Sequence, residues 1–322
     1  MTGLPSRLRE GAGEGAADRA HRLEPSGLSR RLAGLTALMA LAACTVAPSP
    51  VAVSPASVSQ GPAAQADSPP PGFQYLYGSG EAAALSRQVF HMLADSAIAR
   101  AKASARTSVV LDQGATLSAP RWTDCAGKPP AAVFDADETV LLNLGVEELS
   151  ARHPGPFDEK QWDRWERTGA NAVAAVPGAR DAFARMRAAG VAIVINSNRV
   201  DIGGSIAALK AAGLGDFVAG DTLYLRDAGG KSGKDARRAR IAAHYCVVAM
   251  AGDQLGDFSD LFNAIPSVSD RRRAADSGAI AAMWGDGWFV LPNPVYGSGL
   301  KGGYDDVFPL NTRWADPGES KE

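Results

Sequence analysis

The chain has 322 residues, a formal net charge of −2 and an apolar content of 46%. This length and apolar content suit one sizeable globular domain with appendages, or two small domains. The near-neutral charge excludes a general nucleic-acid binder, which would carry a basic stripe, so we expect no nucleic-acid polymer as a partner.

The N-terminal region is typical of an export signal. Arg30 and Arg31 precede a short apolar run over residues 32–43, which ends at Cys44. A basic region, a short apolar run and small residues form a secretory signal, and this run is too short to cross a bilayer as a helix. The final Leu-Ala-Ala-Cys resembles the bacterial lipoprotein signal, in which the cysteine is lipidated; an ordinary signal peptide is the alternative. We therefore expect residues 1–44 to be a lipoprotein signal peptide ending at the lipidated cysteine.

A tether is predicted after this cysteine. Residues 45–72 are rich in Pro, Ala, Ser and Val and almost free of charge, which is typical of a disordered segment. A flexible chain of this length has an end-to-end distance of roughly 30 Å, enough to hold a domain away from a membrane. We expect an exported bacterial lipoprotein, anchored in the outer membrane and facing the periplasm, with a folded domain over residues 73–322.

Within that domain, short apolar runs alternate with amphipathic helical patterns. The spacing predicts helices over residues 81–102, 179–189, 203–212 and 231–243, and strands over residues 131–134, 191–195, 223–225 and 247–251. Strands that alternate with helices predict an α/β fold with a parallel sheet.

Polar side chains follow three of these strands. They are Asp135 and Asp137 after the first, Ser197, Asn198 and Arg199 after the second, and Asp253 and Asp257 after the last. Considered alone, the first pair fits a solvated helix-capping turn as well as a ligand site. The carboxyl ends of parallel strands meet at one edge of the sheet, where ligands bind, so three polar strand ends together favour a site.

The residue types at these ends predict the chemistry. Clustered carboxylates without histidine or cysteine ligands suit a hard cation, and Mg²⁺ fits best. The four histidines have no ligand spacing, which argues against zinc. A cation, hydroxyl and amide donors, and nearby Lys and Arg together describe phosphoryl transfer, in which positioning and charge stabilisation dominate.

At this point the motifs resemble those of the haloacid dehalogenase superfamily. They are more closely similar to the class C acid phosphatases, the bacterial lipoprotein phosphatases and 5′-nucleotidases, over about residues 73–296. The matching strings are Asp135-Ala-Asp137-Glu-Thr139, Trp162-x-x-Trp165, Ala175-Val-Pro177-Gly-Ala179, Ser197-Asn198-Arg199, Gly252-Asp253-Gln-Leu-Gly-Asp257-Phe and Leu291-Pro-Asn-Pro-Val-Tyr296-Gly-Ser. The resemblance implies a Rossmannoid parallel sheet flanked by helices, with a small helical cap from about residues 75–112 and 143–176.

The resemblance also implies hydrolysis of phosphate monoesters, nucleoside monophosphates among them, through an aspartyl-phosphate. Asp135 would attack phosphorus. Asp137 would protonate the leaving alcohol and then activate water, which requires neighbours that let it hold a proton. Ser197 would bind a phosphate oxygen. A lysine would neutralise charge; Lys234 matches the pattern best, and Lys231 is the alternative.

The implied metal and substrate ligands follow from the same comparison. Mg²⁺ would bind to the Asp135 carboxylate, the Asp137 backbone carbonyl and Asp253, with Asp257 either beside the ion or in contact with its ligands. The predicted substrate-binding residues are Thr139, Asn198, Arg199, Trp162 and Tyr296. The last two would clamp an aromatic or nucleobase leaving group by stacking. The chain departs from the family pattern directly after this tyrosine, where Gly-Ser-Gly-Leu replaces Gly-Ser-Trp-Glu, and this bears on nucleotide preference more than on hydrolysis.

Two cysteines remain besides the predicted lipidation site. Cys125 precedes the first strand and Cys246 opens the last. If these strands are neighbours, as in the superfamily, both sulfur atoms lie at the end of the sheet away from the site. We predict a disulfide between them, which exported proteins retain; two buried free thiols are the alternative.

Three other functions make different demands on the sequence. A dehalogenase would not need Asp137 as an acid. A P-type ATPase would need a lysine at position 136 and transmembrane helices. A catalytically inactive lipoprotein of the same fold, binding a nucleotide or a metal, is the alternative from a different class, since a fold does not imply activity.

Overall fold

The structure is a computed structural model, and it describes residues 68–318. The predicted signal peptide, Cys44 and residues 45–67 of the predicted tether lie outside the described residues. Within residues 68–318, no helix combines the length and the apolar character needed to cross a membrane.

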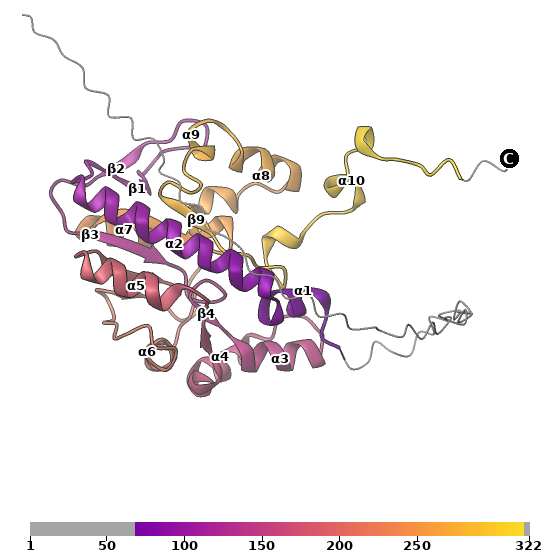
Figure 1. The fold of residues 1–322 in the computed structure, drawn as a ribbon, viewed down its shortest axis with the longest axis horizontal. Helices are drawn as coiled ribbons and strands as arrows, with labels where there is room; N and C mark the ends of the chain where they lie inside the picture. Colours follow the sequence, from indigo (N-terminus) through magenta and orange to yellow (C-terminus); the bar gives the residue numbers. More distant parts are fainter. Residues whose placement is uncertain (1–67, 319–322) are drawn as a thin grey trace, which may run out of the picture. The chain divides into compact units, whose positions relative to one another are not determined.

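A five-stranded sheet forms the centre of the domain (Figure 1). Its order is β7 (Leu223–Tyr224), β6 (Ala192–Asn196), β3 (Pro130–Phe134), β8 (Cys246–Gly252) and β9 (Trp288–Val290), and all neighbours are parallel. The three longest strands agree with the predicted ones to within one residue at each end. The predicted α/β fold with a parallel sheet flanked by helices is confirmed.

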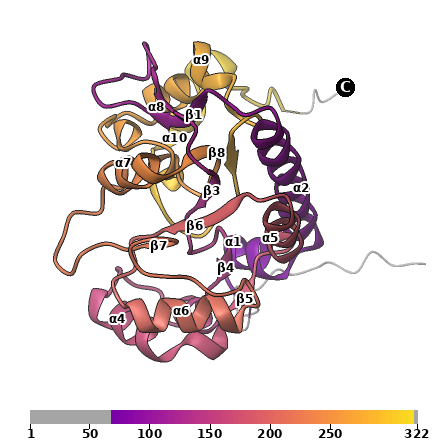
Figure 2. The ribbon, with the colours of Figure 1, turned by 90° about the vertical axis from the view of Figure 1, so that its left-hand side faces the viewer.

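Helices cover both faces of this sheet (Figure 2). On one face α2 (Gly80–Lys102) packs along α5 (Ala179–Ala188), and α6 (Ile202–Ala211) adds buried residues to the same core. On the other face lie α7 (Asp235–His244) and a hairpin of β1 (Thr107–Leu111) and β2 (Trp122–Asp124). Two hydrophobic cores result, one on each side of the sheet.

Strand alternation explains why there are two cores. Successive side chains of a strand point to opposite faces, and in β3 Ala132 and Phe134 belong to the α2 and α5 side while Val133 belongs to the other. The fully buried Phe134 ring lies between Phe90 of α2 at 6.4 Å and Phe183 of α5 at 4.7 Å between ring centroids. Truncating such a ring to alanine typically costs about 3–5 kcal/mol of unfolding free energy.

Two helices and a short strand pair lie between β3 and α5, in the region predicted to form a cap. Residues 143–176 supply α3 (Leu144–Arg152) and α4 (Glu159–Thr168), and the pair β4 (Leu141–Leu142) and β5 (Ala174–Ala175) flanks them. From residues 75–112, α2 packs against α5, β8 and β3. Its apolar face buries the sheet, while Tyr77 in the turn before it donates to Glu138 at 3.2 Å.

The predicted helix over residues 231–243 also begins later than expected, at Asp235. The carboxylate of Asp260 accepts hydrogen bonds from the backbone N–H groups of Lys234 and Asp235, at 2.8 and 2.9 Å. These are two of the donors that a helix start leaves unpaired. Because the capping group comes from a distant segment, the local sequence does not show it.

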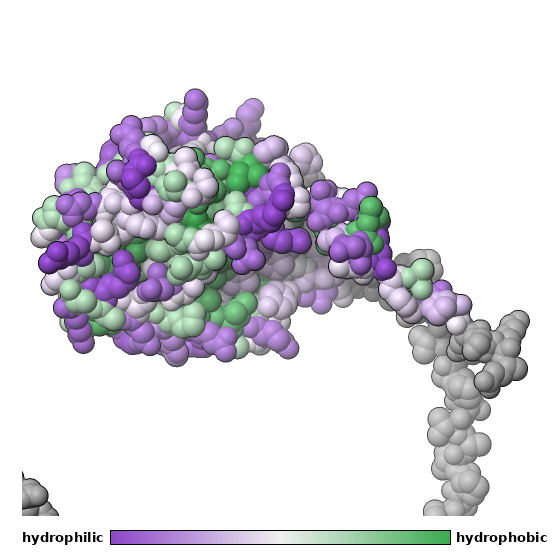
Figure 3. Space-filling model, turned by 90° about the horizontal axis from the view of Figure 1, so that it is seen from above, coloured by the Kyte–Doolittle hydropathy of each residue, from purple (hydrophilic) through white to green (hydrophobic). Residues whose placement is uncertain are grey.

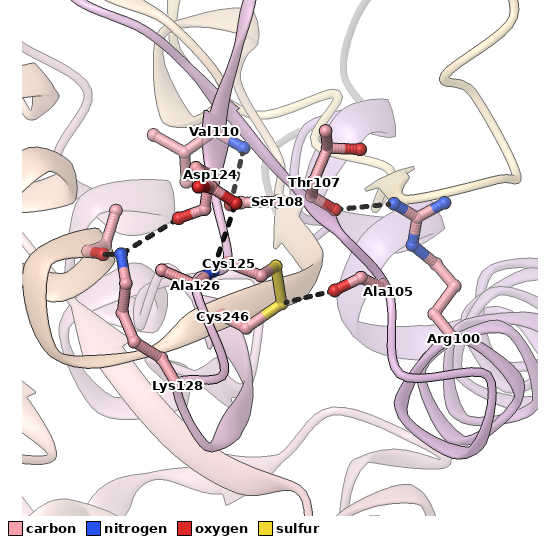
Figure 4. Close-up of a disulfide and its surroundings, with 11 residues drawn as sticks. Arg100, Ala105, Thr107, Ser108, Val110, Asp124, Cys125, Ala126, Lys128 and Cys246 are labelled. Carbon is pink, nitrogen blue, oxygen red and sulfur yellow. Dashed lines mark hydrogen bonds between the residues drawn. A yellow bond between two sulfur atoms is a disulfide. The ribbon is translucent and has the colours of Figure 1, made fainter.

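A disulfide joins Cys125, just after β2, to Cys246, the first residue of β8 (Figure 4). Their Cα atoms are 4.5 Å apart, and 121 residues separate them in the sequence. Lys128 donates to the backbone carbonyls of Asp124 and Ala242 beside them, at 2.9 and 2.7 Å. The disulfide thus fixes the hairpin to the amino end of the sheet.

Short elements complete the described chain. They are α1 (Pro71–Phe73), a π-helical turn (Gln74–Gly78), α8 (Val268–Ala275), α9 (Gly278–Ala281), α10 (Tyr304–Val307), and 3₁₀ turns at Ala170–Ala172, Leu255–Asp257, Asp260–Phe262, Ser298–Leu300 and Leu310–Thr312. Figure 3 shows hydrophobic residues scattered among hydrophilic ones over one face of the domain. In the C-terminal segment the side chains of Tyr304, Leu310 and Trp314 are largely exposed.

Candidate active site

The loop after β3 turns sharply and separates its two carboxylates. The backbone N–H of Asp135 still donates to Ala251 of β8, at 3.0 Å, so this residue continues the strand. Three residues later the chain reverses at Glu138, whose φ is +54° and whose N–H donates to the carbonyl of Leu141 at 2.7 Å. Asp135 and Asp137 therefore face different partners.

Asp135 belongs to a cluster of three carboxylates at the carboxyl edge of the sheet. One oxygen atom each of Asp135, Asp253 and Asp257 lies within 4.8 Å of the others. The buried Lys234 ammonium group donates to Asp135 and, at 2.7 Å, to Asp257. Lys231, the alternative lysine, is exposed; the lysine that contacts the predicted nucleophile is Lys234.

The charges of this cluster perturb one another. Burial raises the pKa of Asp135 well above its usual range, although Lys234 opposes the shift, and Asp257 and Asp253 add to it. Burial and the charge of Asp257 raise the pKa of Asp253 to about 6. Burial alone would lower the pKa of Lys234, but Asp135 and Asp257 raise it above its ordinary value.

The donor chemistry of this cluster suits a divalent cation. Hard cations such as Mg²⁺ and Ca²⁺ take oxygen ligands, and one ammonium group cannot neutralise three carboxylates. Asp253 is held in place by Thr139 Oγ1 at 3.0 Å, Gln254 Nε2 at 2.9 Å and Asn293 Nδ2 at 2.8 Å. Its orientation is thus fixed by neutral donors, which leave its charge available to a metal.

Thr139, predicted to bind substrate, has a different place. It is fully buried, and its hydroxyl group donates to Asp253. The Thr139 side chain therefore orients the Asp253 carboxylate. Neutral hydroxyl donors of this kind fix the orientation of metal-binding carboxylates in many sites.

Asp137 lies in a second polar environment. Its Oδ1 accepts hydrogen bonds from Arg199 Nε at 2.8 Å and Asn143 Nδ2 at 2.9 Å. Arg199, a predicted substrate-binding residue, is 2% exposed, and its guanidinium group donates to Asp137. Asn198 also has a protein partner, because its Oδ1 accepts from Arg237 at 2.6 Å. Ser197, fully buried at the end of β6, accepts from the Arg199 backbone N–H at 3.2 Å.

Asn143 is a site residue that the sequence reasoning missed. It is fully buried, and its amide donates to both Asp137 and Glu138 while its Oδ1 accepts from Arg199 at 2.8 Å and from Trp165 at 3.2 Å. These last two partners lie 56 and 22 residues away. No local pattern identifies such a residue.

Two aromatic residues of the predicted clamp reach the same polar network. The Trp162 indole N–H donates to Glu166 Oε1 at 2.7 Å, and the Arg199 guanidinium lies 5.8 Å from the centre of its ring. The Tyr296 hydroxyl donates to Glu138. Trp165, the second tryptophan of the motif, is half-buried like Trp162, and its indole N–H donates to Asn143 Oδ1 at 3.2 Å.

Two further buried carboxylates, Glu138 and Glu147, lie near Asp137. Burial, followed by the charge of Asp137, raises the pKa of Glu138 to about 8 and that of Glu147 to about 7. Hydrogen bonds to Tyr296 and Asn143 limit the shift of Glu138. Neither glutamate was predicted to belong to the site.

Comparisons with known proteins agree with this site. A family model described as "HAD superfamily, subfamily IIIB (Acid phosphatase)" matches residues 84–299. A structure of the class C acid phosphatase from Bacillus anthracis with tungstate bound is 25% identical, with a TM-score of 0.57. Another structure of that enzyme is 26% identical, also with a TM-score of 0.57. Each alignment covers 76% of this chain and 90% of the other. The residues matched by the family model include all of the carboxylates described above.

Proposed function

The chain belongs to subfamily IIIB of the HAD superfamily, the acid phosphatases, and we propose that it hydrolyses phosphate monoesters with Asp135 as nucleophile and Mg²⁺ as cofactor. That it is a phosphoric monoester hydrolase follows from the family and its structural relatives. The observation that supports the rest is the separation of two neighbouring carboxylates into different environments.

Asp135 has the surroundings that a nucleophile toward phosphorus needs. In the first step its carboxylate oxygen forms a bond to phosphorus, the ester P–O bond breaks, and an aspartyl-phosphate results. The Lys234 ammonium group contacts the same carboxylate, so it is placed to neutralise charge that builds up on the phosphoryl oxygens. The relative that binds tungstate, a phosphate-like oxyanion, supports an oxyanion site here.

Asp137 is the proposed proton carrier. In the first step its protonated form gives the proton to the leaving alcohol, and in the second its carboxylate takes a proton from the water that attacks the aspartyl-phosphate. The contacts of Asp137 with Arg199 and Asn143 hold the carboxylate in one orientation for both transfers. The second step releases phosphate and restores Asp135.

The proposed Mg²⁺ ligands are the carboxylates of Asp135, Asp253 and Asp257, and the Asp137 backbone carbonyl. When bound, the ion would neutralise phosphate charge and orient the phosphoryl group. Thr139 orients Asp253 for this purpose.

We further propose that Trp162 and Tyr296 receive an aromatic or nucleobase leaving group, which makes nucleoside monophosphates candidate substrates. Both side chains are tied to residues around Asp137, the proposed donor of the leaving-group proton. Stacking would tolerate different bases, because every base has a π-face.

The location of the protein is also a proposal. The signal-like residues 1–44 support an outer-membrane lipoprotein that faces the periplasm. The Cys125–Cys246 disulfide is consistent with this, because disulfides persist in oxidising compartments and are rare in the cytosol. Globomycin, which blocks lipoprotein signal cleavage, should cause accumulation of the precursor, and replacement of Cys44 by serine should remove lipid labelling.

One assay tests the catalytic proposal. Purified residues 73–322 are incubated with p-nitrophenyl phosphate and adenosine 5′-monophosphate, in Mg²⁺ or in EDTA, between pH 4 and 8. We expect Mg²⁺-dependent release of phosphate, and we expect Asp135→Asn to abolish turnover with an unchanged melting temperature. An inactive binding protein would show no release under any condition, and activity that survives Asp135→Asn would remove Asp135 as the nucleophile.

A further inference from the structure

Both aromatic residues of the proposed clamp have their polar group fixed by a buried glutamate. Tyrosine and tryptophan pair an apolar ring with a single hydrogen-bonding group, and that group usually finds a partner when buried. Here the partners are carboxylates that are each 1% exposed, Glu166 for Trp162 and Glu138 for Tyr296. This shared arrangement calls for an explanation beyond core packing, because a buried carboxylate costs stability unless donors surround it.

Glu166 connects Trp162 to the loop after β6. Its Oε1 accepts the indole N–H at 2.7 Å, while its Oε2 accepts the backbone N–H groups of Val200 and Asp201 at 2.8 and 2.7 Å. Those two residues directly follow Arg199, whose guanidinium lies over the Trp162 ring and contacts Asp137. The orientation of the indole is thus set by the same loop that holds the proposed acid.

Glu138 connects Tyr296 to the loop after β3. Besides the Tyr296 hydroxyl, its carboxylate accepts from the Tyr77 hydroxyl at 3.2 Å and from the backbone N–H of Asn143 at 3.0 Å. Glu138 directly follows Asp137 in the sequence. Tyr296 comes from the segment after β9, so this contact fixes a C-terminal side chain to the catalytic loop.

The two glutamates are parts of one network. The Asn143 side chain donates to Glu138 at 3.1 Å and accepts from Arg199 at 2.8 Å. Asn143 thus connects the glutamate that holds Tyr296 to the arginine that lies over the Trp162 ring. A ring that is already fixed loses little conformational freedom when a ligand stacks on it. Fixing both rings therefore improves binding of a flat leaving group without any new contact to the ligand.

We propose that Glu138 and Glu166 are positioning residues that hold the two clamp rings and thereby select phosphomonoesters with a flat leaving group. Glu138 holds Tyr296. Glu166 holds Trp162. This inference rests on the proposed phosphatase function, and it assigns to these glutamates a role in choosing the substrate and none in the chemical step.

The geometry supplies specific variants. In Glu166→Gln the two backbone N–H donors keep the amide oxygen on their side, so the amide NH₂ faces the indole N–H, and two donors meet. Trp162→Phe and Tyr296→Phe keep a stacking ring but remove the group that the glutamate holds. Tyr77→Phe is the matched control, because it removes one hydroxyl group that donates to the Glu138 carboxylate and changes neither clamp ring.

The test compares two substrates with the same primary phosphate ester, adenosine 5′-monophosphate and ribose 5-phosphate, with Mg²⁺ present. The selectivity is the ratio of their kcat/KM values. We expect Glu166→Gln and Tyr296→Phe each to lower this ratio on the order of tenfold, mainly by raising KM for the nucleotide. We expect Tyr77→Phe to leave the ratio within about twofold, and Trp162→Phe to remove any further effect of Glu166→Gln.

The outcomes separate the two proposals. If the unaltered protein hydrolyses neither ester in Mg²⁺, the phosphatase proposal fails and this one with it. If it hydrolyses both and the variants leave the ratio unchanged, only the positioning role is overturned. A loss in Tyr77→Phe equal to that in Tyr296→Phe also overturns it, since the charge of Glu138 and not the ring would then decide. If Glu166→Gln fails to fold in a thermal melt, Trp162→Phe decides for this residue.

Discussion

Glu147 gives a prediction in which the sign and the size both follow from its surroundings. It lies in α3, is 7% exposed, and burial and the charge of Asp137 raise its pKa to about 7 from the ordinary 4.5. Between these two values the folded state binds a proton that the unfolded state has lost. The stability linked to this carboxyl group is therefore complete below pH 4.5 and is lost as the pH rises through 7.

The size of the loss follows from the same two values. At about 1.36 kcal/mol per pH unit, the difference between about 7 and 4.5 corresponds to roughly 3 kcal/mol of unfolding free energy at pH 8. Glu147→Gln removes the charge at every pH, but its amide must also be desolvated. We therefore expect the variant to be more stable than the unaltered protein by about 1–3 kcal/mol at pH 8, and nearly equal to it at pH 4.5.

Urea unfolding at pH 4.5 and pH 8, at one Mg²⁺ concentration, measures both differences. Glu148→Gln is the matched control, because the neighbouring Glu148 is exposed and pairs with Arg152 in the same helix. A surface pair of this kind contributes about 0–1 kcal/mol. A stability gain in Glu147→Gln that is the same at both pH values, or a loss at pH 8, would refute the reasoning.

Three further predictions follow from buried contacts. Lys234→Met leaves two clustered carboxylates without their cation, so thermal melting in EDTA should show a loss of about 3–5 kcal/mol that Mg²⁺ reduces; an equal loss with and without Mg²⁺ would argue against a cation there. Replacing Cys125 and Cys246 by serine opens a loop of 121 residues and should cost about 2–5 kcal/mol in urea unfolding, with activity retained at 25 °C; unchanged unfolding would contradict this. A Cβ at Gly204 would lie 1.8 Å from a backbone carbonyl of α4, so Gly204→Ala should lower the melting temperature far more than Gly203→Ala, where the nearest atom is 3.7 Å away.

Much of the central sheet could be predicted because its strands carry strong local signals. The runs that became β3, β6 and β8 are apolar, short and bounded by turn residues, so their ends were placed to within one residue. The strands β1, β2, β4, β5 and β9 were not predicted. Four of them contain two or three residues each, which is too few to show a period, while the five-residue β1 was missed although it is longer.

The site residues likewise fall into those that local sequence patterns predict and those that they do not. The carboxylates and Lys234 lie at the ends of strongly patterned strands and helices, where a parallel sheet brings separate segments together. Asn143 and Glu166 act through contacts between distant segments, and nothing in their immediate sequence distinguishes them from other polar helix residues. The same reason explains Arg199 and Asn198, whose placement was predicted while their protein partners, Asp137 and Arg237, were not.

The turn at Glu138 shows why one short motif can serve two chemical roles. A non-glycine residue with positive φ costs about 1–2 kcal/mol, and Glu138 adopts it at +54°. The reversal sends Asp137 toward Arg199 while Asp135 stays with Lys234. The donors that surround the Glu138 carboxylate hold the strained turn in place. Glycine at this position would relieve the strain and still allow the turn, but it would remove the carboxylate that accepts the Tyr296 hydroxyl. The backbone strain and the separation of Asp135 from Asp137 therefore both result from the turn at Glu138.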